Sequence, residues 1–99
     1  MAEKRLFKEI REAILKNLAS GKKTINQIAG ETKINWRTVS NHLTYLMGKK
    51  LVVEVFHSPY VRIFELAEEG ERYLNYQYPE YMNKLKTAKK KDEREVPKL

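Results

Sequence analysis

The sequence predicts a mainly α-helical fold with a small β-hairpin, in one domain that is followed by a C-terminal helix. Three observations support this prediction. The chain has 99 residues, the size of a single domain. In several segments apolar residues recur at every third or fourth position, which is the spacing of a buried helix face. Two short β-branched runs within residues 51–66 flank a Ser-Pro turn, a pattern typical of an antiparallel hairpin.

The first three helices are predicted in the first half of the chain. Residues 4–19 carry one apolar stripe and end at Ser20-Gly21. The stripe consists of Leu6, Phe7, Ile10, Ile14, Leu15 and Leu18. Within this helix we expect an ion pair between Glu12 and Lys16 on the solvent side.

The second helix is expected over residues 25–30, with Thr24 and Gln27 as a capping box. A tight turn at residues 30–33 follows. Asn35 then caps a third helix at residues 36–47, which Gly48 ends.

The second half contains the predicted hairpin and the C-terminal helix. The strands are expected at residues 51–56 and 61–66, and the helix at residues 67–91. Pro79 lacks a backbone N–H and should kink or break this helix near Tyr78. Residues 92–99 have no apolar periodicity and are expected to be a disordered tail. The predicted organisation is therefore a domain at residues 1–66 with a helical extension.

The composition excludes several classes of protein. No cysteine is present, so a disulfide framework, a thiolate nucleophile and a cysteine-based metal site are excluded. Two histidines and one aspartate leave little for acid–base or metal chemistry, so we expect no enzyme, no metal site and no cofactor. No apolar run reaches the roughly 18 residues of a membrane helix, and residues 1–11 do not resemble a signal peptide. We expect no membrane association and a cytoplasmic location.

The positive charge lies in the first half of the chain. Residues 1–50 carry eleven basic and four acidic side chains, which accounts for the whole net charge of +7. Such an excess favours a nucleic-acid partner. The second and third helices and their turn form a helix-turn-helix, and the hairpin adds a wing. The sequence therefore predicts a nucleoid-associated protein that binds double-stranded DNA.

The third helix is predicted to be the recognition helix, in the major groove. Val39, Leu43 and Leu46 lie on one face and should be buried. The opposite face has the donor and acceptor groups that suit base edges. The predicted base-reading residues are Trp36, Arg37, Ser40, Asn41 and Thr44. Two alternatives stay open: this face is an ordinary solvated surface, or Trp36 covers the edge of the core.

Cationic and polar groups around this helix are predicted to contact the DNA backbone. The residues are Lys22, Lys23, Thr24, Asn35, Thr38, Lys49, Lys50, His57 and Arg62. The two predicted caps, Thr24 and Asn35, are expected to act first on their own helices. Residues 51–66 are net negative, so the wing is expected to brace a phosphate rather than enter the minor groove.

The segment from Thr38 to Leu43, then Leu46, and then Gly48 to Val52, closely resembles winged helix-turn-helix regulators of the MarR and ArsR type. The resemblance spans residues 10–74. The chain also resembles small archaeal and archaeal-virus winged-helix proteins that append a C-terminal dimerising helix. The resemblance implies a transcriptional regulator. An ArsR-like metal sensor is disfavoured, because His42 and His57 have no cysteines beside them and His42 is expected to be structural.

A homodimer is predicted through the C-terminal helix. Leu74, Tyr78, Tyr81 and Leu85 are spaced by four, three and four residues, like a coiled-coil seam, and Met82 widens it. The alternative is that this helix folds back onto the first helix of its own chain. A symmetric dimer should bind an inverted repeat.

The sequence leaves three functions open. A sequence-specific regulator is favoured by the varied polar face of the third helix. A non-specific architectural or chromatin protein needs only the positive charge of the first half. A protein-interaction winged helix needs neither this charge nor the polar face of the third helix. No small-molecule effector can be identified from the sequence.

Overall fold

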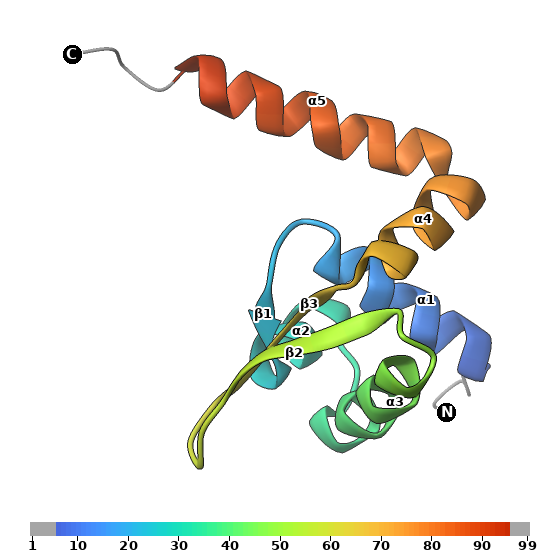
Figure 1. Ribbon diagram of the computed structural model, residues 1–99, viewed down its shortest axis with the longest axis vertical. Helices are drawn as coiled ribbons and strands as arrows, with labels where there is room; N and C mark the ends of the chain where they lie inside the picture. The colour runs from blue at the N-terminus through green and yellow to red at the C-terminus, as the bar shows by residue number, and fades with distance from the viewer. Residues whose placement is uncertain (1–5, 96–99) are drawn as a thin grey trace.

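The computed structural model describes the backbone of residues 6–95 and the side chains of residues 6–87. These residues form helices and strands in the order α1 (Phe7–Leu18), β1 (Lys23–Thr24), α2 (Ile25–Thr32), α3 (Trp36–Gly48), β2 (Val52–His57), β3 (Arg62–Leu66), α4 (Glu68–Gln77) and α5 (Pro79–Glu95). Figure 1 shows α1, α2 and α3 grouped around one side of the hairpin, with α5 extending away from the body. The predicted winged helix-turn-helix with a C-terminal helical extension is confirmed.

The caps of the helix-turn-helix form as predicted. The backbone N–H of Gln27 donates to the Thr24 hydroxyl at 3.1 Å, and the Gln27 side chain accepts from the Thr24 N–H at 2.9 Å. The side chain of Asn35 accepts from the backbone N–H of Arg37 at 2.8 Å. Helix α2 continues to Thr32, beyond its predicted end at Gly30, and Lys33 terminates it in the left-handed conformation with φ 61°. The turn between α2 and α3 is therefore shorter than predicted.

The core lies between α1, α2, α3 and the inner face of the sheet. Its buried apolar side chains include Ile14, Ile28, Leu43 and Phe64. The predicted stripe of the first helix is correct from Ile10 onward. Leu6 and Phe7 were wrongly expected in this stripe, since they are 67% and 66% exposed at the N-terminal end of α1.

The sheet has three antiparallel strands in the order β1-β3-β2. Strand β1 was not predicted, because two residues are too short for a recognisable alternation. Val55 is an extra residue in β2: Glu54 pairs with Phe64, and Phe56 already pairs with Ile63. This bulge shifts the register between the base and the tip of the wing.

The C-terminal helix is broken where Pro79 predicts a break. Tyr78 has non-helical backbone angles, φ −135° and ψ 61°, and Pro79 begins α5. A proline is tolerated at the first position of a helix because its missing N–H would have no partner there. The backbone remains helical to Glu95, so the prediction of a disordered tail is wrong for residues 92–95. Residues 96–99 lie outside the described part of the chain.

Helices α4 and α5 pack on α1 of the same chain. Leu74 and Met82 are buried in the core, so the prediction that they line a dimer seam is wrong. The hydroxyl of Tyr81 donates to the carbonyl oxygen of Lys16 at 3.1 Å, and that of Tyr78 donates to Glu12. The fold-back alternative therefore describes the first turns of α5. Glu12 bonds with these helices and with Lys8, so the expected pair between Glu12 and Lys16 was wrong.

Among the described residues, no helix is long and apolar enough to span a lipid bilayer.

Candidate nucleic-acid interface

Helix α3 presents a polar face to solvent. Arg37, Asn41 and Thr44 lie on this face, and all three are exposed. Ser40 is half-buried at the margin, and Trp36, at the first position of the helix, is 54% exposed. The structure therefore brings the five predicted base-reading residues to one end and one face of α3. The exposure of Trp36 does not fit the alternative in which it covers the core edge.

The opposite face of α3 is fixed in the core. Val39, Leu43 and Leu46 are buried, as predicted, and their packing sets the helix orientation. His42 is also buried, which agrees with the structural role expected for it. Because this face is packed in the core, α3 cannot rotate about its own axis, and the same residues always face solvent.

Arg11 adds a second anchor that the sequence did not reveal. Its guanidinium group lies 3.5 Å from the ring centre of Tyr45, and its Nε donates to Nδ1 of His42 at 3.2 Å. Burial lowers the pKa of His42, and the positive charge of Arg11 lowers it further, so the imidazole is held neutral as an acceptor. Arg11 and His42 are 31 positions apart, and no local pattern could have linked them.

Several polar groups of the predicted backbone-contact set already have partners. Thr24 and Asn35 cap their helices, and Thr38 is half-buried. Lys23 lies with its Nζ 2.6 Å from Glu31, and this hydrogen bond holds the pKa of Glu31 below its usual value. The exposed Thr44 hydroxyl, on the predicted base-reading face, donates to the Ser40 carbonyl oxygen at 3.2 Å, one turn earlier in α3.

Three lysines of this set differ from Lys23. Lys22, Lys49 and Lys50 are exposed, and within the described part of the chain no ion pair joins them to a carboxylate. Lys22 precedes α2, whereas Lys49 and Lys50 follow α3. Lys50 takes a left-handed conformation, φ 64°, where the chain leaves α3 for the wing. These exposed ammonium groups therefore stand just before and just after the helix-turn-helix in the chain.

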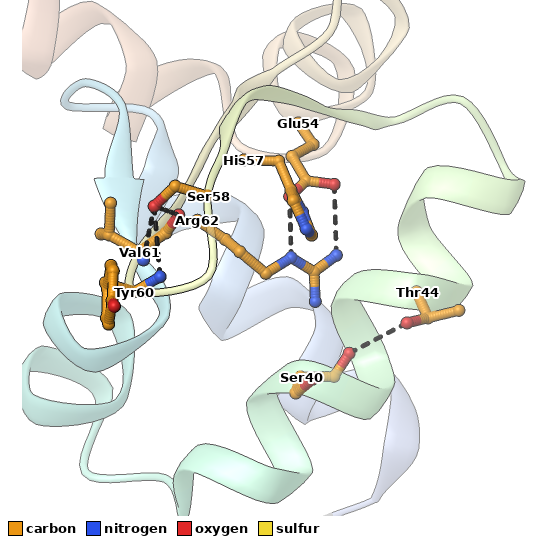
Figure 2. Close-up of polar contacts among 8 residues, drawn as sticks. All are labelled: Ser40, Thr44, Glu54, His57, Ser58, Tyr60, Val61 and Arg62. Carbon is orange, nitrogen blue, oxygen red and sulfur yellow. Dashed lines mark hydrogen bonds and ion pairs between the residues drawn. The ribbon is translucent and has the colours of Figure 1, made fainter.

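In the wing, both predicted contact residues bond to Glu54. Arg62 donates to this carboxylate twice, from Nε at 2.7 Å and from Nη2 at 3.2 Å. His57 Nδ1 lies 2.8 Å from the same group. The hydrogen bonds from Arg62, together with that from His57, lower the pKa of Glu54 to about 2. Figure 2 shows the guanidinium group directly opposite the carboxylate.

The tip of the wing is closed by a serine. The Ser58 hydroxyl accepts from the backbone N–H groups of Tyr60 and Val61, at 3.2 and 3.1 Å (Figure 2). This local turn leaves Tyr60 almost fully exposed. The hydrogen bonds of this turn are local and follow from the Ser-Pro sequence. The contact of Arg62 with Glu54 instead joins β3 to β2, and the sequence did not predict it.

Residues 8–53, the helix-turn-helix and the start of the wing, match the family model described as bacterial regulatory protein, arsR family. No curated protein sequence matches the chain.

Solved structures share the fold. An apo mutant of ZitR from Lactococcus lactis gives a TM-score of 0.68 at 22% identity, over 89% of this chain and 68% of that chain. A possible transcriptional regulatory protein fragment from Mycobacterium bovis gives 0.56 at 30% identity, over 65% and 68%. A homodimeric winged helix-turn-helix DNA-binding domain from Mycobacterium bovis, a possible ArsR-family regulator, gives 0.57 at 24% identity, over 90% and 76%. The chain thus has the winged helix-turn-helix fold, and the match of residues 8–53 places it among DNA-binding transcription regulators similar to the arsR family.

Proposed function

We propose that this protein is a sequence-specific regulator that inserts α3 into the major groove of double-stranded DNA. The observation that carries the proposal is the exposed polar face of α3, formed by Arg37, Asn41 and Thr44 on a helix whose other face is locked in the core. Arginine binds guanine through O6 and N7, and asparagine binds adenine through N6 and N7. The Thr44 methyl group suits contact with thymine. Trp36 and Ser40, four positions apart, lie together at one margin of this face.

The exposed lysines are proposed to contact phosphates. Lys22 precedes α2 and Lys49 and Lys50 follow α3, and all three are exposed. Each phosphate that a lysine neutralises releases counterions from the DNA. A plot of the logarithm of the binding constant against the logarithm of the salt concentration therefore becomes steeper by about 0.9 for each such contact. Lys23 and Arg62 belong to the same proposed set, but a phosphate would have to compete with Glu31 and Glu54 for them.

The protein is further proposed to bind an inverted repeat as a homodimer. Support comes from the Mycobacterium bovis domain, which is described as homodimeric, and from α5, whose backbone continues past Leu85 to Glu95 and extends away from the body (Figure 1). Tyr81 and Leu85 in this helix, and Tyr78 just before it, remain partly exposed. In a two-fold dimer the two α3 helices would face successive major grooves, about 34 Å apart.

Selection of bound sequences from random duplexes tests the specific function. An enriched inverted repeat is the expected result. Tight binding without enrichment would favour the architectural protein, and a folded protein that binds no duplex would favour the protein-interaction module.

Substitutions on α3 test the residue assignment. Arg37→Ala and Asn41→Ala should each cost about 1–3 kcal/mol on the selected site and relax the preference at one base pair. Lys49→Ala should instead weaken binding to all sequences equally and flatten the salt slope by about 0.9. Fluorescence anisotropy on the selected and a scrambled duplex measures both. Equal losses on the two duplexes for Arg37→Ala and Asn41→Ala would contradict the base-reading assignment.

A further inference from the structure

Glu54 places a carboxylate on the inner face of the wing. Its neighbour two positions back, Val52, is buried in the core, and side chains two apart in a strand share a face. On the facing strand, Arg62 shares a face with the buried Phe64, and its guanidinium carbon lies 5.1 Å from the centre of that ring. Glu54 and Arg62 therefore both belong to the face that continues the core surface beyond the hydrophobic contacts.

This face is next to the recognition helix. Strand β2 packs against α3, and Figure 2 shows Arg62 and Glu54 on the side of the wing where Ser40 and Thr44 lie. Because this face adjoins α3, we expect a sugar-phosphate strand that borders the major groove to pass along it when α3 enters the groove. The chain thus sets a negative group where a polyanion would lie.

The Glu54 carboxylate binds both Arg62 and His57 of the wing. Arg62 uses Nε and Nη2 on Glu54, a bidentate arrangement that a phosphate would also seek. Because Glu54 stays ionised at neutral pH, it can only accept, so His57 Nδ1 donates to it. The charges of Arg62 and Glu54 cancel, which explains why a wing with a well-placed arginine contributes no net positive charge.

We infer that Glu54 is an internal competitor of the DNA phosphate: by holding Arg62, it restrains the contribution of the wing to DNA binding. This inference rests on the proposed function. Carboxylate and phosphate are alternative ligands for one guanidinium group, so binding of the backbone by Arg62 requires loss of the bond to Glu54. Glu54 also repels the phosphate directly. Because the phosphate contact is independent of sequence, this restraint acts equally on every duplex.

The variant Glu54→Gln tests the inference with nearly the same side-chain shape. Freed Arg62 should add one phosphate contact, which steepens the logarithmic salt slope by about 0.9. The ratio of the variant's affinity to the wild-type affinity should therefore be up to about eightfold larger at 0.1 M salt than at 1 M salt. The same increase is expected on the selected and the scrambled duplex. Anisotropy titrations over a salt series give both quantities, and thermal melts followed by circular dichroism establish that each variant is folded.

Two control variants separate this mechanism from a general change of charge. Glu65→Gln makes the same charge change on β3, at the position paired with Val53, an exposed residue of the outer face. It should leave the salt slope unchanged. The double variant Glu54→Gln with Arg62→Gln should lose the gain of Glu54→Gln, because the arginine that makes the new contact is absent.

The following results would overturn the inference. A loss of affinity in Glu54→Gln would mean that the carboxylate holds Arg62 in its binding position. An equal gain in Glu65→Gln, or a gain that persists in the double variant, would assign the effect to net charge. Failure of the wild-type protein and of all variants to bind DNA would reject the proposed function together with the inference, whereas binding by the wild type without a gain in Glu54→Gln would reject the inference alone.

Discussion

Gly70 allows α4 to approach the segment that follows α3. A Cβ at this position would lie 2.1 Å from the carbonyl oxygen of Leu51. That oxygen accepts the backbone N–H of Ala67 at 3.0 Å and cannot move away without loss of this bond. Gly70→Ala should therefore lower the free energy of unfolding by about 1–3 kcal/mol through overpacking, as measured by urea denaturation.

Gly30 provides the matched control in another helix. A Cβ there would meet nothing within 4 Å, and Gly30 is exposed in α2. Gly30→Ala should stabilise the protein by about 0.5–1 kcal/mol, because alanine loses less backbone entropy in a helix. Equal effects of the two substitutions would show that contact with Leu51 does not determine the residue at position 70.

Glu54 also predicts a pH dependence of stability. Its pKa falls from 4.5 to about 2 on folding, chiefly through the hydrogen bonds from Arg62. A depressed carboxyl pKa contributes stability that is complete above the unfolded value and is lost as the pH falls through the folded value. Urea denaturation between pH 7 and pH 2 should show a constant difference between wild type and Glu54→Gln above about pH 5, which shrinks toward pH 2. A difference that does not change with pH would contradict this origin.

At the scale of elements, Glu12 joins three helices. Its carboxylate in α1 accepts from the hydroxyl of Tyr73 in α4 at 2.7 Å and from that of Tyr78 at the start of α5. Burial would raise the pKa of Glu12, but the bonds from Tyr78 and Tyr73 outweigh it and lower the pKa. The same contact with Glu12, with burial second, raises the pKa of Tyr78 to about 12. The junction of α4 and α5 is therefore tied to the DNA-binding core through one side chain.

Replacement of Glu12 tests this connection. Because the folded pKa of Tyr78 lies above the ordinary value of 10, its hydrogen bond contributes stability below pH 10 that is lost as the pH rises through about 12. In Glu12→Gln, Tyr78 should ionise at a lower pH than in the wild type, which ultraviolet titration of tyrosinate detects. Glu9→Gln, an exposed position of the same helix, should leave the titration unchanged. A late-titrating tyrosine that persists in Glu12→Gln would contradict the assignment.

At the scale of the whole molecule, the first turns of α5 pack on the core of their own chain, whereas the proposed dimer uses the later part of α5. A chain that ends at residue 87 keeps the contacts of Tyr78, Tyr81 and Met82 but removes the end of α5. It should keep its melting temperature, become monomeric and lose tight binding to the inverted repeat while still binding a half-site. Light scattering at tens of micromolar measures the mass. A full-length chain that is already monomeric there would contradict the proposed dimer.

The sequence alone determined the helix-turn-helix and its caps. Thr24 with Gln27, and Asn35 with α3, are contacts within three residues, and the buried face of α3 follows from a helical period. Such backbone signals are local, so they depend on few other residues, whereas the side-chain pair of Glu12 with Lys16 gave way to tertiary partners. The break at Pro79 belongs to the same class, since it follows from a missing N–H.

Only the tertiary structure decided which partners meet across elements. Arg11 with His42, Glu12 with Tyr78, and Glu54 with Arg62 join residues that no periodic pattern relates. The apolar face that contains Leu74 and Met82 was identified in the sequence, but its partner was not. An amphipathic helix lowers its free energy equally well against its own chain or a second copy, because the hydrophobic effect depends on the area removed from water and not on which chain covers it.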